Sequence, residues 1–191
     1  MINYSNFMLL TMFIFLSFAG CKKMLQNDDD VRFEKIGSVV LDKHLNLIWT
    51  KNDQGFFDYK DAQEHCSKLE LDGHREWRLP TIDEWRSIIE GCPGSKSGGK
   101  CMVSDICVNR NKCYSFDCKC PELKGPGEYG CYWNDKVWGK ECSGYWSDTK
   151  NPEFGAFGQS GLWIILFDRG SLGTTSLENR WYTKCVKAIQ K

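Results

Sequence analysis

Short apolar stretches bounded by polar turns predict β-strands near both ends of the chain. In the first half, residues 37–42 and 47–50 flank a polar turn at 43–46, which predicts a β-hairpin. In the second half, three further strands are predicted at 145–147, 162–168 and 181–187, with glycines between them. The long stretch between these two groups has no extended apolar periodicity.

Between the hairpin and that stretch, apolar residues recur at helical spacing in two segments. The first predicted helix runs from about 59 to 71, with Asp58 as its N-cap and Asp72-Gly73 at its end. One face of this helix carries Tyr59, Ala62, Cys66 and Leu69. Because helices come early and strands lie at both ends, the order indicates an α+β fold with an antiparallel sheet.

The segment Trp77-Arg78-Leu79-Pro80-Thr81 separates the first helix from a second one. Its proline disfavours a helical conformation at the preceding leucine. Its threonine forms a capping-box pattern with Glu84, which predicts that the second helix starts at residue 82 and continues to Gly91. The apolar face of that helix is Ile82, Trp85, Ile88 and Ile89. We interpret Trp77 and Leu79 as core residues and Arg78 as a structural clamp.

Length and charge limit the classes of function. With 191 residues, the chain is long enough for one domain of ordinary size. It carries 25 basic and 25 acidic residues, so its formal net charge is zero. Proteins that bind nucleic acid usually show a basic excess or a basic stripe, so we expect no nucleic-acid partner.

The first twenty residues carry no charged side chain, and residues 7–20 are almost wholly apolar. This run is too short to span a bilayer as a helix and suits the apolar region of a signal peptide, which we assign to residues 1–20. The sequence Phe18-Ala19-Gly20-Cys21 resembles the bacterial lipobox. The resemblance implies that Cys21 becomes the lipidated N-terminus, with palmitate among its acyl chains. An ordinary secretory signal with a chance cysteine is the alternative.

A lipidated Cys21 would make membrane lipid a partner of the protein, because each buried CH₂ contributes about 0.8 kcal/mol of membrane affinity. Lys22 follows the cysteine where an aspartate commonly signals inner-membrane retention, so the resemblance favours the outer membrane or cell surface. Residues 21–34 are expected to form a solvated tether.

Eleven cysteines are present, and lipidation of Cys21 leaves ten. An even number in an exported chain is typical of a disulfide framework. Eight of the ten lie in the region without apolar periodicity, where crosslinks worth about 2–4 kcal/mol each would limit the entropy of the unfolded state. The ten are Cys66, Cys92, Cys101, Cys107, Cys113, Cys118, Cys120, Cys131, Cys142 and Cys185.

A zinc site is the rival interpretation of this cysteine run, since close cysteines can bind zinc as thiolates. The run contains no Cys-x-x-Cys pair and no histidine, so disulfides are favoured and no metal is expected. A bridge between Cys118 and Cys120 would strain the preferred geometry, so these two are not expected to pair with each other.

Several segments together resemble the Lcl C-terminal domain family, a bacterial group with a C-type-lectin-like fold. They are Val40-Leu41-Asp42, Leu47-Ile48-Trp49-Thr50, Ala62, Cys66, Trp77-Arg78-Leu79-Pro80-Thr81 with Glu84, Tyr145-Trp146-Ser147 and Lys184-Cys185-Val186-Lys187. The chain departs from the family pattern at Asp148, where a second serine is common, and at Lys184, near which the pattern often has an arginine. The Cys-rich insertion at about 92–142 is a larger departure.

The resemblance implies a C-type-lectin-like domain at residues 35–191, with two helices against a small antiparallel sheet and a long disulfide-rich loop region. In that fold a bridge joins the first helix to the terminal strand, and by resemblance this pair is Cys66–Cys185. The other eight cysteines would then pair within 92–142, where 105 connectivities are open.

Candidate chemistry is sparse. Trp133-Asn134-Asp135 matches the calcium triplet of sugar-binding C-type lectins, but no second acidic group stands at a suitable spacing. His65 and Cys66 are neighbours on one helix and do not face each other, so they form no catalytic pair. No phosphate-binding loop or nucleophile elbow appears, so we expect no cofactor and no enzyme. Formylglycine-generating enzymes share a related fold, but nothing singles out a reactive pair among the ten cysteines.

The sequence therefore favours a non-enzymatic lipoprotein of the cell envelope that binds a glycan or a protein through its loop region. Trp133 and Trp138 lie in that region, where exposed rings would stack on a sugar or anchor a protein. If they instead cover the disulfides, a purely structural envelope protein is the alternative. The exposure of these two rings separates the two hypotheses.

Overall fold

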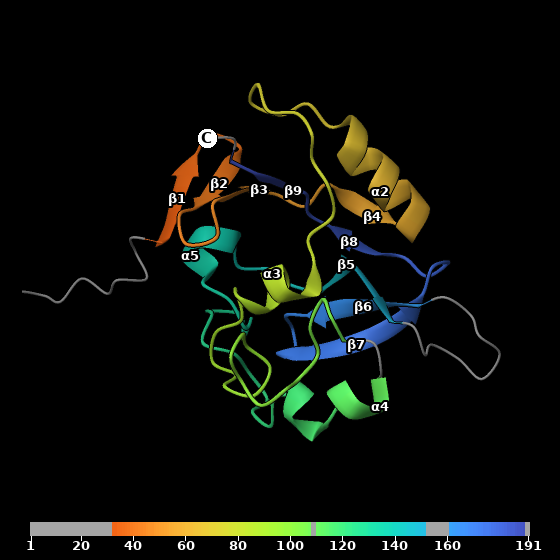
Figure 1. Ribbon diagram of the computed structural model, residues 1–191. Coiled ribbons are helices and arrows are strands. Elements are labelled where there is room, and N and C mark those ends of the chain that lie inside the picture. The colour runs from red at the N-terminus through yellow and green to blue at the C-terminus, as the bar shows by residue number, and fades with distance from the viewer. Residues whose placement is uncertain (1–31, 108–109, 152–160, 190–191) are drawn as a thin grey trace, which may run out of the picture.

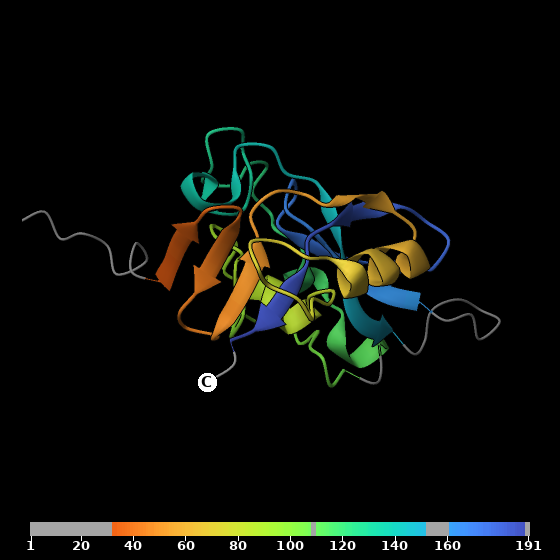
Figure 2. The same cartoon turned by 90° about the horizontal axis from the view of Figure 1, so that it is seen from above.

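A computed structural model shows two β-sheets and a few short helices in the described part of the chain (Figures 1 and 2). The structure describes residues 32–107, 110–151 and 161–189. The expected signal peptide, Cys21 and most of the expected tether lie outside the described residues. In the described parts of the chain, no helix is long and apolar enough to cross a membrane.

The first sheet is antiparallel and has the order β1-β2-β3-β9. Its strands are β1 (Phe33–Ile36), β2 (Val39–Asp42), β3 (Leu47–Thr50) and β9 (Val186–Ala188). β2 and β3 form the predicted hairpin, with Val40 paired to Trp49. Both side chains are fully buried, so the hairpin contributes directly to the core.

The second sheet has the order β4-β8-β5-β6-β7. Its strands are β4 (Gly55–Phe57), β5 (Gly144–Asn151), β6 (Gly161–Leu166), β7 (Ser171–Ser176) and β8 (Trp181–Thr183). Its pairings are antiparallel except that of β5 with β8, which are parallel at Tyr145 and Tyr182. The fold is therefore α+β, but the expectation of one small sheet is wrong, because the strands divide between two.

The predicted last strand at 181–187 is divided between the two sheets, as β8 and β9. Lys184 and Cys185 lie between the two strands, and both are anchored by the end of β3. The Lys184 ammonium donates to the carbonyl of Lys51 at 2.8 Å, and the Cys185 amide donates to the Thr50 hydroxyl at 3.0 Å. These bonds hold the chain where it passes from one sheet to the other.

Both predicted helices exist and both are shorter than expected. α2 (Tyr59–Lys68) begins after the predicted N-cap Asp58 and ends at Leu69, which is already extended. α3 (Ile82–Arg86) begins with the predicted capping box of Thr81 and Glu84. Ile88 and Ile89 are buried as predicted, but in the turn that follows α3. The remaining helices are α4 (Arg110–Cys113), η1 (Phe116–Cys118) and α5 (Asp135–Trp138).

The segment between α2 and α3 packs against the end of the chain. Trp77 and Leu79 are buried, as predicted. The backbone of Arg78 exchanges hydrogen bonds with Val186 of β9, at 2.9 and 2.8 Å. The Arg78 guanidinium pairs with Glu84 at 2.6 Å but is half-exposed, so it fastens the start of α3 from the surface.

The fold begins within the segment expected to be a tether. The Arg32 guanidinium pairs with the buried carboxylate of Asp42 at 2.6 Å and donates to the Ser87 carbonyl at 2.7 Å. The Phe33 ring packs edge-on against Trp138 at 5.3 Å between centroids. Residues 32–34 are therefore part of the domain, because they supply contacts that the buried groups require.

Candidate functional site

The loop region between residues 92 and 142 holds three of the four disulfides in the described residues. They are Cys101–Cys118, Cys107–Cys113 and Cys131–Cys142, and the fourth is Cys66–Cys185. The last of these joins α2 to the segment before β9 and is the pair that the family resemblance implies. As expected, Cys118 and Cys120 do not pair with each other. Figure 1 shows the loops on the side of the molecule away from α2.

One buried arginine organises the first part of this region. Arg86, the last residue of α3, donates from Nε to the Ser95 carbonyl at 2.9 Å and from Nη2 to the Cys101 carbonyl at 2.7 Å. Its other bonds go to the carbonyls of Lys96 and Val103. A buried carbonyl without a donor costs free energy, so this guanidinium fixes the path of residues 95–103.

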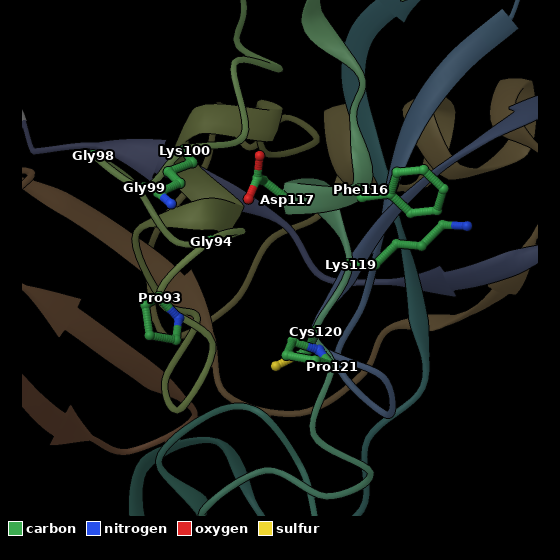
Figure 3. Close-up of a pocket in the computed structure, with 10 residues that line it drawn as sticks. All are labelled: Pro93, Gly94, Gly98, Gly99, Lys100, Phe116, Asp117, Lys119, Cys120 and Pro121. Atoms are coloured by element: carbon green, nitrogen blue, oxygen red, sulfur yellow. The ribbon is translucent and has the colours of Figure 1, made fainter.

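A pocket of about 670 Å³ opens beside this loop (Figure 3). Two segments form its walls: the first wall is residues 93–100 and the second wall is residues 116–121, which includes η1. The lining residues are Pro93, Gly94, Gly98, Gly99, Lys100, Phe116, Asp117, Lys119, Cys120 and Pro121. Cys101–Cys118 links the two walls, with its Cα atoms 4.7 Å apart.

Glycine allows the two walls to approach one another. A Cβ atom on Gly94 would lie 2.5 Å from the backbone oxygen of Asp117 in the opposite wall. A Cβ on Gly99 would lie 2.2 Å from the backbone oxygen of Pro93 within its own wall. Both distances are shorter than real contacts, so the pocket needs glycine at these positions.

Exposed apolar side chains concentrate in the same region. Among the described residues, the five most exposed large apolar side chains all lie between 102 and 129: Met102, Ile106, Phe116, Leu123 and Tyr129. The Phe116 ring is 90 % exposed and lines the pocket, and the Lys119 ammonium lies 5.9 Å from its centre. An aromatic ring this exposed gains no free energy from the fold itself, so it is available to a partner.

Two cysteines of the region carry free thiols, which corrects the expectation that all ten of the domain pair. Cys92 is buried directly before the first wall, and Cys120 is partly exposed in the second wall. The Cys120 sulfur lies 3.8 Å from the carbonyl of Gly91, the residue that directly precedes Cys92. Burial, followed by the neighbouring Cys92 thiol, raises the pKa of the Cys120 thiol above its usual value.

The expectation that Trp133 and Trp138 present an exposed aromatic surface is wrong. Their exposed fractions are 1 % and 4 %. The Trp133 indole donates to the Gly139 carbonyl at 3.0 Å, and its ring packs 4.7 Å from that of Phe167. The Trp138 ring contacts Trp49 at 5.6 Å. Burial of such large rings stabilises the core, and this gain outweighs any exposure in a loop-rich segment.

A family model described as the Lcl C-terminal domain matches residues 38–187, which is most of the chain. The chain belongs to the Lcl C-terminal domain family. Neither the comparison with curated proteins nor that with solved structures found a match. The match includes the whole loop region, so the pocket lies within the Lcl domain.

The Trp-Asn-Asp triplet of this Lcl domain serves the local structure around α5. Asn134 is its N-cap and accepts from the Lys136 amide at 3.1 Å. The Asp135 carboxylate accepts from the Glu128 amide at 2.9 Å. No group of three or more metal-ligating side chains occurs in the described residues, and eight of the cysteine sulfurs are in disulfides.

A buried lysine of the Lcl domain forms an ion pair with a partly exposed aspartate, and neither residue lines the pocket. The Lys184 ammonium pairs with Asp53 at 2.9 Å, and the Tyr145 hydroxyl donates to the same carboxylate at 3.2 Å. Burial lowers the pKa of Lys184, and the Asp53 charge opposes that shift. Since the ammonium also lies 5.9 Å from the ring centre of Trp133, we interpret it as part of the packing.

Sequence reasoning missed Arg86 and Phe116, the residues that shape and line the pocket. No sequence motif marks Arg86, which follows the apolar residue Trp85 on α3. Its role depends on carbonyls up to 17 residues away. Phe116 is a phenylalanine, a residue type that is usually buried in the core, so the sequence gives no sign that it is exposed. The sequence placed the candidate site in the loop region, which also contains the pocket, but it named two aromatic residues that are buried.

Proposed function

We propose that this Lcl domain is a non-enzymatic binding module of the bacterial cell envelope, anchored through lipid on Cys21. Its ligand is a protein segment, bound at the pocket between the two walls. Phe116 carries the proposal, because its exposed ring lies on a loop that a disulfide already holds in place. Binding a partner therefore does not require this loop to become ordered. A rigid site avoids part of the entropy cost of association.

The chemistry of the exposed side chains favours a protein over a glycan. Sugars stack on aromatic faces, whereas Met102, Ile106 and Leu123 are aliphatic and exposed in the same region. Aliphatic surface of this kind is desolvated favourably by apolar side chains of a partner protein. The pocket adds Lys100, Asp117 and Lys119 for polar contacts.

The C-type-lectin-like fold is part of this proposal. Support comes from the bridge between α2 and the segment before β9, which the resemblance implies, and from the long loops between α3 and β5. These loops correspond in position to the ligand-binding loops that the resemblance implies. The purely structural alternative keeps one argument, the burial of Trp133 and Trp138.

Replacing Phe116 with alanine tests the binding proposal. The full chain should bind protein components on an array of matrix proteins and glycans, and Phe116→Ala should weaken that binding by about 2 kcal/mol, roughly 30-fold, as expected for an aromatic anchor. Ile36→Ala is the matched control, because Ile36 is exposed and apolar but lies on β1. Binding to glycans alone, equal binding by Phe116→Ala, or no binding would each contradict the proposal.

Replacing Cys21 with serine tests the anchor. The variant should accumulate as an unprocessed precursor and take up no radiolabelled palmitate. Cys21 is the thiol that follows the lipobox-like residues 18–20, and its replacement removes the site of acylation. The wild-type chain should carry the label and fractionate with the membrane. Equal labelling of both chains would disprove lipidation at this residue.

A further inference from the structure

Cys92 and Cys120 are placed differently from the cysteines that form disulfides. The eight bonded cysteines leave these two as the free thiols of the described residues. The Cys120 sulfur lies 3.8 Å from the carbonyl of Gly91, the residue that directly precedes Cys92, so the two cysteines are close neighbours. In Figure 3 the Cys120 sulfur points to the side of the view on which Pro93 of the first wall lies.

These thiols stand at a junction between the same two segments that Cys101–Cys118 already joins. Cys92 directly precedes the first wall and Cys101 directly follows it, while Cys118 and Cys120 are both in the second wall. One end of the first wall is thus crosslinked to the second wall by a disulfide. At its other end, the first wall is preceded by Cys92, whose free thiol lies near that of Cys120 in the second wall. A bond there, together with Cys101–Cys118, would close a covalent ring that contains the first wall.

The surroundings distinguish the two thiols from each other. Cys92 is buried, whereas Cys120 is partly exposed and lines the pocket. The phenol of Tyr132 also contacts Cys120, and burial raises the pKa of that phenol as well. Cys120 is the accessible thiol of the two, so an external disulfide reaches it first and reacts with the fraction that is ionised, which the raised pKa keeps small. The buried neighbouring thiol then resolves the product.

We propose that Cys92 and Cys120 form a reversible dithiol–disulfide site that controls the coupling between the two walls of the pocket. The reaction partner is a small disulfide or a thiol–disulfide oxidoreductase. The Cys120 thiolate attacks one sulfur of that disulfide, whose S–S bond breaks and releases one thiolate. Cys92 then loses its proton and attacks the Cys120 sulfur, which releases the second thiolate. The two cysteines lose two electrons and two protons, and the external disulfide becomes two thiols.

This site is independent of the proposed ligand, because its test follows the oxidation state of the cysteines. The full chain is equilibrated with graded ratios of reduced to oxidised glutathione, quenched with acid, alkylated and mapped without reduction. The Cys92–Cys120 peptide should convert between bridged and doubly alkylated forms across these ratios. Cys101–Cys118 should stay bridged throughout, as structural disulfides resist the glutathione couple.

The order of attack is tested by single variants. With oxidised glutathione, Cys92→Ser should retain a glutathione adduct on Cys120, whereas Cys120→Ser should show no adduct on the buried Cys92. Near-ultraviolet circular dichroism checks that both variants fold. An adduct on Cys92 alone, or on neither variant, would overturn the proposal.

Coupling of the walls is tested by limited trypsin digestion at Lys100 and Lys119. The oxidised form should be cleaved at least about tenfold more slowly than the dithiol form, because a crosslink suppresses the local opening that cleavage requires. Three results contradict the proposal: thiols that stay alkylated at every ratio, a bridge reduced only together with Cys101–Cys118, and equal cleavage of the two forms.

Discussion

Arg86→Met is expected to lower the free energy of unfolding by about 4 kcal/mol, a large part of the stability of a domain of this size. The methionine fills a similar volume but donates no hydrogen bond. The four carbonyls of Ser95, Lys96, Cys101 and Val103 would lose their shared donor. Each buried carbonyl left without a partner costs about 1–3 kcal/mol, reduced where the loop relaxes toward water.

Urea unfolding followed by tryptophan fluorescence measures this loss. Arg78→Met is the matched control, since Arg78 is also an arginine of the α3 region but is half-exposed and pairs with Glu84 at the surface. Exposed ion pairs contribute about 1 kcal/mol or less, so the control should lose far less stability. Similar losses in the two variants would contradict the role assigned to Arg86.

The elements that local sequence determines were predicted well. The hairpin of β2 and β3, the N-cap at Asp58 and the capping box of Thr81 and Glu84 each depend on residues close in the chain. A helix cap depends on residues three positions apart, and a short strand depends on neighbouring apolar residues, so both patterns can be seen in the sequence. The family resemblance likewise led to the correct membership, because its most specific motif is one continuous segment, residues 77–81 between α2 and α3.

Elements whose existence depends on distant partners were not predicted. β7, for example, contains Gly173 and four hydroxyl residues among its six and becomes a strand because β6 pairs along its whole length. β4 is three residues long and is held by β8. The division into two sheets likewise depends on bonds between Lys184, Cys185 and the end of β3.

The candidate site was predicted in outline only. The sequence located it in the Cys-rich region, but composition does not reveal which aromatic residues of a loop are buried. Trp133 is covered because Phe167 and Tyr145 come from β-strand regions far along the chain. Phe116 remains exposed because the turn that carries it is fixed by Cys101–Cys118. Both outcomes depend on tertiary contacts.

The double variant Cys66→Ala/Cys185→Ala is expected to lose more stability than any other disulfide removal in the described residues. The bridge spans 119 residues, so the chain-entropy model assigns it about 5 kcal/mol. The bridge is also fully buried against Trp77 and Leu79 in one cluster of the core, so its removal opens space there.

The matched control is Cys131→Ala/Cys142→Ala, which opens a bridge across 11 residues. The same model assigns that bridge about 3 kcal/mol, so the two double variants should differ by about 2 kcal/mol in urea unfolding. Because Cys66–Cys185 joins α2 to the junction of the two sheets, its loss should broaden or divide the unfolding transition, whereas loss of the loop bridge should leave it single. Equal stability of the two variants would show that α2 is held by packing, and that the long bridge contributes little.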